Sequence, residues 1–148
     1  MLLTSPSFNH NEKIPPKFTF DGGNINPELH IQNVPPEAKS LVLIMDDPDA
    51  PGGNFTHWLT WNINPMTQII KQESKPPFAA EGLNGRQKIG YTGPCPPDDK
   101  PHRYFFKLYA LKEKIDPDPN ISKSDLENAI KLLIVEKAEF IGTYERIQ

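Results

Sequence analysis

Three carboxylates and a histidine fall within one short stretch, IMDDPDAPGGNFTHWLTWNIN at residues 44–64. Asp46, Asp47 and Asp49 follow an apolar run, and His57 opens an aromatic run after a pair of glycines. Carboxylates and imidazoles can share protons, so such a group can bind a ligand or act as acid and base. Asp47 also precedes a proline, which drives it toward extended geometry and restricts its carboxylate. The stretch is therefore a candidate site at the ends of two strands.

A second histidine, His102, opens another strand-like run, PHRYFF at 101–106. If the strands that follow His57 and His102 run in compatible directions, both imidazoles meet at one end of the sheet with Asp47 nearby. The alternative is structural, because aspartates are common in turns, where they accept hydrogen bonds from backbone N–H groups. Taken alone, DPDAP at 47–51 favours such a turn. The sequence leaves a shared site and a plain turn both open.

Other chemistries fit the sequence less well. A calcium loop counted from Asp47 has Trp58 where the EF-hand pattern requires glutamate. Cys95 is the only thiol, and its spacing to His102 is not typical of zinc ligands. It lies between two prolines, where we expect it to pack into a rigid loop. A GxSxG motif for a serine hydrolase is missing from the sequence. We therefore expect neither a metal, nor a cofactor, nor an activated nucleophile.

The chain has the size and composition of one globular domain, residues 1–148, with 36% hydrophobic and 24% charged residues. Its net charge of −3 argues against binding to nucleic acid, which needs a basic surface. No apolar run approaches the roughly 20 residues of a membrane span, and the start lacks the pattern of a signal peptide. A single cysteine fits a reducing compartment. We expect a cytoplasmic protein without an integral membrane segment.

The elements that would position the candidate residues are mostly short strands. SLVLIM at 40–45 is apolar throughout and is predicted to be covered on both faces, whereas ELHIQNV at 28–34 alternates as a half-buried strand does. The 17 prolines favour many shaped loops between such strands. The irregular segment 76–101 is long enough to be a functional loop. Strands are predicted at 17–20, 28–34, 40–45, 56–64, 68–72 and 102–111, with a last strand within 138–148.

One helix is predicted late in the chain, within SKSDLENAIKLLIVEKA at 122–138. Either Ser122 or Ser124 can cap its N-terminus, because each is followed three residues later by an acid that completes a capping box. The apolar residues recur with helical spacing and predict a well-buried helix. The stripe that would face the core comprises Leu126, Ala129, Ile130, Leu132, Leu133, Ile134 and Val135. The sequence thus predicts a mainly antiparallel β domain with a single late helix.

Several motifs together resemble one family. These are DPDAP at 47–51, FTHW at 55–58, GYTGPCPP at 90–97 and PHRYFFKLYAL at 101–111, supported by LTSPSF and GGNINPEL nearer the start. In this order they are similar to the phosphatidylethanolamine-binding proteins, in particular the bacterial and archaeal Raf-kinase-inhibitor-like branch. The resemblance runs nearly end to end. It implies a mainly β (α+β) fold in which a large antiparallel sheet packs on a smaller sheet, with the main helix near the C-terminus.

The resemblance also implies a pocket at one end of the main sheet that binds a phosphate-like anion. Arg103 and Asp49 are implied as supporting residues, with Arg103 holding the acidic loop. Asp99 stands where the branch usually has a glycine in the turn before PHRY, and Asp tolerates left-handed geometry better than most residues. The residues implied to bind the ligand or shape its walls are Asp47, Pro48, Pro51, His57, Pro96, Pro97, His102 and Tyr104.

A physical role for the acids follows from this implied pocket. Bare carboxylates repel an anion, but Asp47 or Asp49 can accept a proton from an imidazole, fixing its tautomer and favouring its charged form. The other ring nitrogen and the Tyr104 hydroxyl would then donate into the pocket. Phe55 and Tyr91 would give the rim an apolar side. We expect anion binding to weaken above neutrality, as the imidazole loses its charge.

The leading hypothesis is a non-enzymatic, anion-binding protein that regulates a kinase or another phosphoprotein. An inhibitor of serine proteases is the second hypothesis, since some relatives show that activity and the loop at 76–101 could be presented to a protease. A small hydrolase that uses the Asp/His pocket is the third. The partners left open are a small anion or phosphate-bearing ligand, a protein kinase, a protease and a second copy of the chain.

Overall fold

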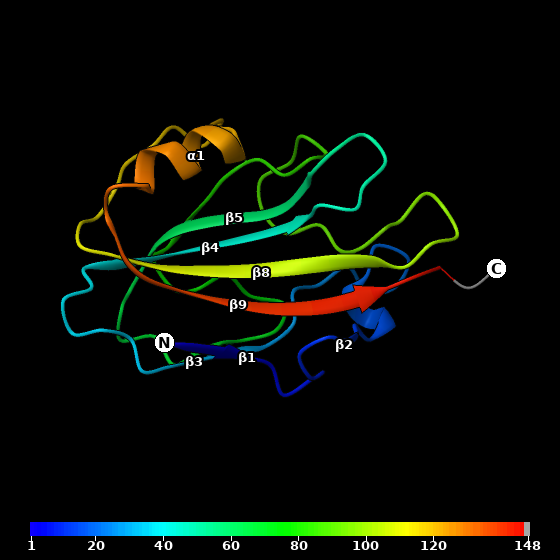
Figure 1. Cartoon of the computed structure of the whole chain (residues 1–148), viewed down its shortest axis with the longest axis horizontal. Coiled ribbons are helices and arrows are strands. Elements are labelled where there is room, and N and C mark those ends of the chain that lie inside the picture. The colour runs from blue at the N-terminus through cyan, green and yellow to red at the C-terminus, as the bar shows by residue number, and fades with distance from the viewer. Residues whose placement is uncertain (147–148) are drawn as a thin grey trace.

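The computed structural model describes residues 1–146 and contains two β-sheets (Figure 1). The larger sheet has the strand order β2-β9-β8-β4-β5-β7, and the smaller has the order β1-β3-β6. The strands are β1 (Leu2–Thr4), β2 (Glu12–Lys13), β3 (Leu29–Gln32), β4 (Ser40–Asp47), β5 (Phe55–Ile63), β6 (Ile69–Ile70), β7 (Ala80–Glu81), β8 (His102–Leu111) and β9 (Ile134–Tyr144). Helix α1 spans Lys123–Ile130, and a 3₁₀ turn, η1, spans Pro16–Phe18.

The larger sheet is covered on both faces. One face packs against the smaller sheet, where Leu41, Leu43 and Met45 of β4 share a core with Leu29 and Ile31 of β3. The opposite face packs against α1, which lies over β4 and β5 in Figure 1. Successive strand residues point to opposite faces, so β4 must be apolar at nearly every position. This explains why its whole length is buried, as its sequence predicted.

Pairing within the larger sheet is mostly antiparallel, as expected. β4 pairs antiparallel with both β5 and β8, and β8 pairs antiparallel with β9 along its whole length. The short β2 is the exception, because it pairs parallel with β9. The predicted strand at 102–111 coincides with β8, and β3 shows the alternating burial that its sequence predicted. A mainly β fold of two sheets with one late helix is thus confirmed.

The strand predicted at 17–20 is wrong. Residues 16–18 form the 3₁₀ turn η1, with a proline at its first position and Phe18 fully buried. Proline fixes φ near the value of a helical turn and has no N–H for a sheet ladder. Of the two aromatic residues that suggested a strand, Phe18 packs in the cluster between the two sheets, whereas Phe20 is exposed.

The helix is shorter than predicted. Ser122 is its N-cap, accepting a hydrogen bond from the Asp125 N–H at 3.0 Å, so the first of the two proposed caps is the one used. α1 ends at Ile130, and the residues from Ile134 onward form β9 instead. Leu132 is 85% exposed rather than buried. The apolar residues Ile134 and Val135 belong to the start of β9, where β-branched side chains favour an extended strand although both remain partly exposed.

The last strand starts earlier than the predicted 138–148 and ends at Tyr144; residues 147–148 lie outside the described part of the chain. Within residues 1–146, none of the helices has the length and apolar character needed to cross a membrane.

Candidate functional site

Three neighbouring strands bring the candidate residues to one end of the larger sheet. β4 lies between β5 and β8 and runs antiparallel to both. The end of β4 therefore lies beside the starts of β5 and β8, which places Asp47, His57 and His102 together although Asp47 and His102 are 55 positions apart. The candidate residues therefore lie together, as the interpretation as a shared site required.

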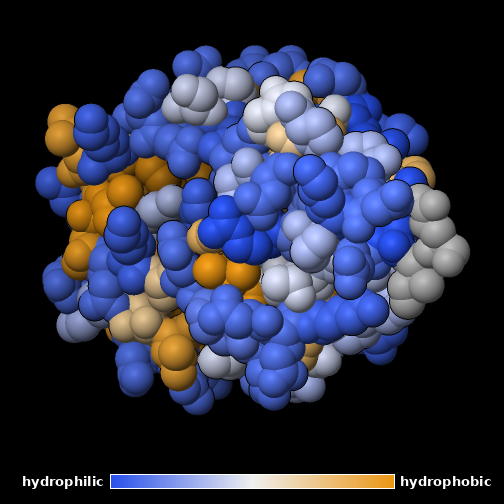
Figure 2. All heavy atoms as spheres, turned by 45° about the vertical axis from the view of Figure 1, so that its right-hand side comes forward, coloured by the Kyte–Doolittle hydropathy of each residue, from blue (hydrophilic) through white to orange (hydrophobic). Residues whose placement is uncertain are grey.

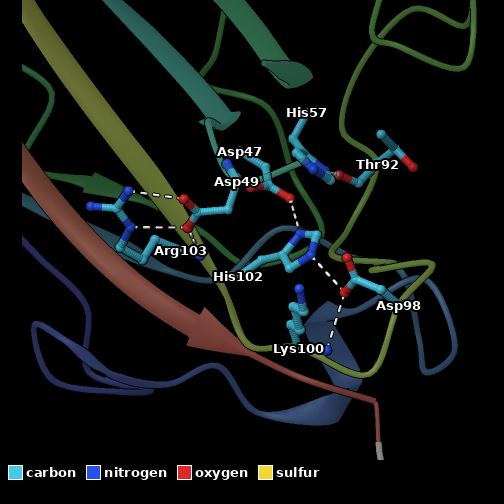
Figure 3. Close-up of polar contacts among 8 residues, drawn as sticks. All are labelled: Asp47, Asp49, His57, Thr92, Asp98, Lys100, His102 and Arg103. Atoms are coloured by element: carbon cyan, nitrogen blue, oxygen red, sulfur yellow. Dashed lines mark hydrogen bonds and ion pairs between the residues drawn. The ribbon is translucent and has the colours of Figure 1, made fainter. Parts of the chain in front are cut away.

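His102 is held between two carboxylates (Figure 3). Its Nδ1 lies 2.6 Å from Asp47 Oδ2, and its Nε2 lies 2.9 Å from Asp98 Oδ1. Burial opposes a charge on His102, but the hydrogen bonds and charges of the two aspartates outweigh it, so the pKa of His102 is raised. Burial raises the pKa of Asp47 despite the hydrogen bond from His102. The pairing thus favours a charged imidazole on the side of Asp47 away from the cavity.

A second ion pair fixes the acidic turn between β4 and β5. The Arg103 guanidinium donates from Nε and Nη2 to the two carboxylate oxygens of Asp49, each at 2.9 Å (Figure 3). The Arg103 backbone N–H donates to the same carboxylate. Hydrogen bonds from the Arg103 side chain hold the pKa of Asp49 at about 2. Arg103 therefore holds the acidic loop, which is the arrangement that the resemblance implied.

His57 has a different environment from His102. It is 3% exposed, and its Nδ1 lies 2.7 Å from the carbonyl oxygen of Thr92. No carboxylate of the described residues lies within hydrogen-bond distance of its ring. Burial lowers the pKa of His57 to about 4. The expectation of a charged pocket imidazole favoured by a neighbouring acid is therefore wrong for His57, because its burial is not compensated by such an acid.

The Tyr104 ring lies next to both imidazoles. It meets the His57 ring edge-on, with centroids 5.2 Å apart, and stacks on His102 at 6.4 Å. Its hydroxyl is buried and has no hydrogen-bond partner among residues 1–146. Burial raises the pKa of Tyr104, so this hydroxyl stays protonated and remains a donor. Buried polar atoms of this kind call for an explanation, since most are hydrogen-bonded.

A cavity of about 660 Å³ opens over these residues. Its lining combines polar groups with apolar ring and loop atoms. The lining residues are Asp47, Ala50, Pro51, Gly52, Gly53, Asn54, Phe55, His57, Gly85, Arg86, Gly93, Cys95, Pro97 and Tyr104. In Figure 2 the loop end of the sheet is turned toward the viewer; hydrophilic side chains dominate there, and apolar side chains gather toward the left of the view.

Five of the eight residues implied as ligand-binding or wall residues line this cavity, and three do not. His102 lies behind Asp47 and borders a separate surface hollow with Asp98 and Arg103. Both of its ring nitrogens face carboxylates, so neither donates into the cavity as expected. Pro48 is exposed, and Pro96 is buried away from the cavity. The two prolines that do shape the wall are Pro51 and Pro97.

The loop that closes the cavity is anchored through its backbone. Two hydrogen bonds join Thr92 and His57. The His57 Nδ1 lies 2.7 Å from the Thr92 carbonyl oxygen, and the Thr92 N–H donates to the His57 carbonyl at 3.0 Å. Asn24 Oδ1 accepts the Gly93 N–H at 2.7 Å. At Gly93 the chain passes so close to the Phe18 carbonyl that a Cβ there would overlap it. The long irregular segment is therefore an ordered wall of the cavity.

Sequence reasoning missed several contributors. Thr92 contacts His57 through its backbone carbonyl, which every residue type has, so the sequence could not single it out. Arg86 lies in a turn that reaches the cavity only in the tertiary structure. Asp98 could have been found, because it precedes His102 by four positions next to the noted Asp99. Asp99 itself does not adopt the left-handed conformation that its place in the turn suggested. Cys95 lines the cavity rather than only packing within its loop.

Comparisons with known proteins identify the family of the chain. The model of the phosphatidylethanolamine-binding protein (PEBP) family matches residues 4–145. The chain is 43% identical over 152 residues to UPF0098 protein PH1269 of Pyrococcus horikoshii, an alignment covering 98% of this chain and 77% of that one. It is 42% identical over 151 residues to a UPF0098 protein of Methanothermobacter thermautotrophicus, covering 99% of each.

Two crystal structures share the fold over nearly its full extent. CT736 from Chlamydia trachomatis, described as a PEBP homolog, matches with a TM-score of 0.93 and 40% identity, covering 99% of this chain and 97% of that one. E. coli YBCL, described as a new member of the mammalian PEBP family, matches with a TM-score of 0.92 and 32% identity, covering 99% and 98%. The chain belongs to the phosphatidylethanolamine-binding protein family.

Proposed function

We propose that this protein is a non-enzymatic binding protein that holds a small ligand through a phosphate-like anionic group in the cavity at the end of the larger sheet. The observation that carries the proposal is the Tyr104 hydroxyl, a buried donor without a partner among the described residues, on a side chain that lines the cavity. The hydroxyl is enclosed by the surrounding atoms, so a ligand oxygen would reach it after a small shift of the cavity wall and would satisfy a donor that otherwise costs free energy.

The size and lining of the cavity support a small, partly polar ligand. Its volume of about 660 Å³ falls within the usual range of ligand pockets. Phe55, Pro51 and Pro97 supply apolar walls, while Asn54 and Arg86 supply donors at the rim. Such a mixture suits a phosphorylated group with a short organic substituent.

The charges around the cavity are compatible with a single anion. Arg86 is the only lysine or arginine among the described residues that lines it, and its guanidinium stacks 3.8 Å from the centroid of the Phe20 ring. The Asp47 carboxylate faces the cavity but is paired with His102, whose raised pKa favours the charged form. The pairing reduces the repulsion that a bare carboxylate would exert on an anion.

The contacts of His102 and Cys95 support binding rather than turnover through those two side chains, whereas His57 keeps one ring nitrogen without a partner among the described residues. A general base must offer a free ring nitrogen to the proton that it removes. His102 has both nitrogens engaged by aspartates, and Cys95 Sγ accepts a hydrogen bond from the Arg146 guanidinium at 3.0 Å. Kinase regulation and protease inhibition stay predictions of the resemblance, because they would act through partner surfaces and not through the contacts described for the cavity.

The test is calorimetric titration with phosphoethanolamine and inorganic phosphate on the wild type, on Tyr104→Phe and on the control Tyr109→Phe. Tyr109 lies on the same strand but packs on the α1 side. We expect saturable binding that weakens about tenfold in Tyr104→Phe, as loss of one hydrogen bond predicts, and is unchanged in Tyr109→Phe. Tyr104→Phe should fold at least as stably as the wild type, because its hydroxyl has no protein partner to lose.

Two results would contradict the proposal. One is the lack of saturable binding, or equal binding by the wild type and Tyr104→Phe. The other is turnover of p-nitrophenyl acetate or p-nitrophenyl phosphate that disappears in His102→Ala, which would make the protein an enzyme.

A further inference from the structure

We propose that the end of the molecule opposite the cavity is a docking face for anionic lipid membranes, with the Phe78 ring entering the lipid layer and lysines contacting the phosphate headgroups. The contact is peripheral and involves none of the cavity residues, so it is independent of the proposed function. We call this region the end face. It lies where β4 and β9 begin and β5 and β8 end, at the left of Figure 1, and comprises residues 36–39, 64–66, 76–79, 112–115 and 131–133.

The most exposed large apolar side chains of residues 1–146 all lie on the end face. Phe78 is fully exposed, and Leu132 and Met66 are 85% and 83% exposed. They come from three separate loops, which are the turn before β7, the junction between α1 and β9, and the connection between β5 and β6. Single exposed apolar residues are common on protein surfaces. Three of them gathered at one end of the molecule indicate a contact surface.

Phe78 is held outward by a strained turn. The Ala79 N–H donates to the Pro76 carbonyl at 3.2 Å, so Phe78 is the third residue of a β-turn. Its φ of 62° is left-handed, as at this position of a type II turn, which favours glycine or asparagine. Lys75 Nζ fixes the turn by donating to the Ala79 carbonyl at 2.8 Å. The exposed ring gains no packing that offsets this strain, and strained residues cluster at functional positions.

The charge of the end face differs from that of the whole chain. The chain has a net charge of −3, yet lysines outnumber acids in the loops of the end face. Within residues 1–146 none of these lysines takes part in an ion pair, so each ammonium group is available to an anionic surface. The exposed lysines are Lys39, Lys112, Lys114 and Lys131, and the acids in the same loops are Glu37 and Glu113.

A hollow of about 420 Å³ lies next to the Phe78 ring. Lys39 and Lys114 line it together with Pro65 and Phe78, and its described lining residues include no acid. Two ammonium groups without a carboxylate suit a phosphate group, because charged hydrogen bonds to phosphate are strong. The hollow would thus hold the headgroup of an anionic lipid whose chains pack against the ring.

A lipid surface fits the end face better than a protein partner does. A protein would need a matching pocket for each of three apolar side chains that protrude from separate loops. A fluid lipid layer receives such side chains without preformed pockets, and the lysines between them remain at the level of the headgroups. The excess of lysine selects membranes with a negative surface.

The first measurement is sedimentation of the full chain with lipid vesicles. We expect saturable binding to vesicles made of equal parts of phosphatidylglycerol and phosphatidylcholine, and binding at least about tenfold weaker to phosphatidylcholine alone. Binding to the mixed vesicles should weaken as the salt concentration rises from about 0.05 M to about 0.5 M, because salt screens exposed charges.

The variant Phe78→Asn separates membrane contact from folding. Asparagine adopts left-handed geometry more readily than phenylalanine, so we expect the urea midpoint to be equal or higher. Affinity for the mixed vesicles should fall about tenfold, because the apolar ring is lost. The control is Ile89→Asn, since Ile89 is 54% exposed but lies outside the end face. It should bind vesicles as the wild type does.

A charge-matched pair tests the lysines. We expect Lys114→Glu to weaken binding to the mixed vesicles about tenfold, because it replaces an attraction by a repulsion at the hollow. Lys88→Glu makes the same change in net charge at an exposed position outside the end face, and its effect should be clearly smaller.

Insertion can be observed directly with Phe78→Trp. Trp58 and Trp61 are buried, so they give a constant background. The added tryptophan should shift its emission to shorter wavelength on the mixed vesicles and be quenched by lipids with brominated chains.

Several results would overturn the inference. They are the lack of binding to the mixed vesicles, equal binding to both kinds of vesicle, and equal binding by the wild type and Phe78→Asn. Self-association without vesicles that disappears in Phe78→Asn would mean that a second copy of the chain covers the end face. Vesicle binding that free phosphoethanolamine displaces would mean that headgroups enter the cavity, which would support the proposed function and overturn this inference.

Discussion

The two histidines of the site have opposite electrostatic environments, although similar positions at the starts of strands suggested similar roles. His102 lies between Asp47 and Asp98, which raise its pKa against the effect of burial. His57 donates only to a neutral carbonyl, and burial lowers its pKa to about 4. The surroundings of His102 therefore favour its charged form, and those of His57 favour its neutral form. The difference depends on which atoms surround each ring, not on the residue type.

At the scale of single residues, the His102 clamp predicts a specific pH dependence of stability. The pKa of His102 is higher in the folded protein than in the unfolded chain, so the charged ring stabilises the fold. This contribution is fully present below the unfolded pKa of about 6.5. It is lost as the pH rises through the folded pKa. We expect His102→Gln to lower the free energy of unfolding by about 2 kcal/mol at pH 6, as for a hydrogen-bonded charged group. Urea denaturation from pH 6 to 9 should show this deficit shrinking as the pH rises.

The control for this experiment is His30→Gln, which removes a half-exposed imidazole on β3 whose polar side-chain partner is Glu28. Its effect should be small, as for exposed ion pairs. A deficit in His102→Gln that is constant with pH, or that grows toward pH 9, would mean that the two aspartates do not raise the pKa of His102.

At the scale of elements, α1 is short and depends on its contacts with the sheet. Isolated helices of this length are not stable in water. Leu126 and Ile130 bury their side chains against the outer face of β4 and β5. Lys123, at the start of the helix, lies 3.4 Å from the buried Asp46 carboxylate and 2.9 Å from Glu127. Because Asp46 and Asp47 are adjacent on β4, their side chains point to opposite faces of the sheet. Asp46 pairs with Lys123 of the helix, and Asp47 lines the cavity.

The helix cap gives a matched pair of substitutions. Ser122 Oγ accepts the Asp125 N–H at 3.0 Å, whereas Ser124 is exposed within the helix. We expect Ser122→Ala to lower the free energy of unfolding by about 1 kcal/mol. Ser124→Ala should leave it unchanged or raise it by a few tenths of a kcal/mol, because alanine has the higher helix propensity. Thermal and urea denaturation measure both, and equal effects of the two variants would exclude Ser122 as the cap.

At the scale of the whole molecule, the buried neutral His57 predicts an acid limb of the stability profile. Its folded pKa of about 4 lies below the unfolded value of about 6.5. In this window the unfolded chain binds a proton that the folded protein does not, so stability falls as the pH decreases. We expect a loss of about 2 kcal/mol between pH 6.5 and pH 5. Below pH 4, protonation of Asp49, whose folded pKa is about 2, should lower the stability further.

Comparison with His57→Phe checks this assignment by urea denaturation across the same range. The variant should lose stability between pH 6.5 and 5 by clearly less than the wild type, whatever its stability at neutral pH. A variant with the same slope as the wild type in this window would show that burial does not lower the pKa of His57.

Much of the fold was predictable because its signals are local. Continuous apolar character identified β4, aromatic β-formers identified β8, and the motifs around Asp47, His57 and His102 identified the family. The incorrect predictions occurred where apolar or aromatic residues that fit one kind of element belong to another kind in the structure. The apolar spacing after Ile130 belongs to the ladder between β9 and β8, and the aromatic residues near Phe18 belong to a proline-started turn. In both cases tertiary packing outweighed local periodicity.

For the site, the sequence by itself determined the residue types and the family, because Asp, His and Tyr occur in motifs that can be read along the chain. The antiparallel placement of β4 between β5 and β8 decided which of them meet. Only the tertiary structure decided their protonation, since a pKa depends on burial and on partners distant in sequence, such as Thr92 for His57 and Asp47 for His102. That is the physical reason why the sequence predicted a charged imidazole in the cavity, whereas burial favours the neutral form of His57 there.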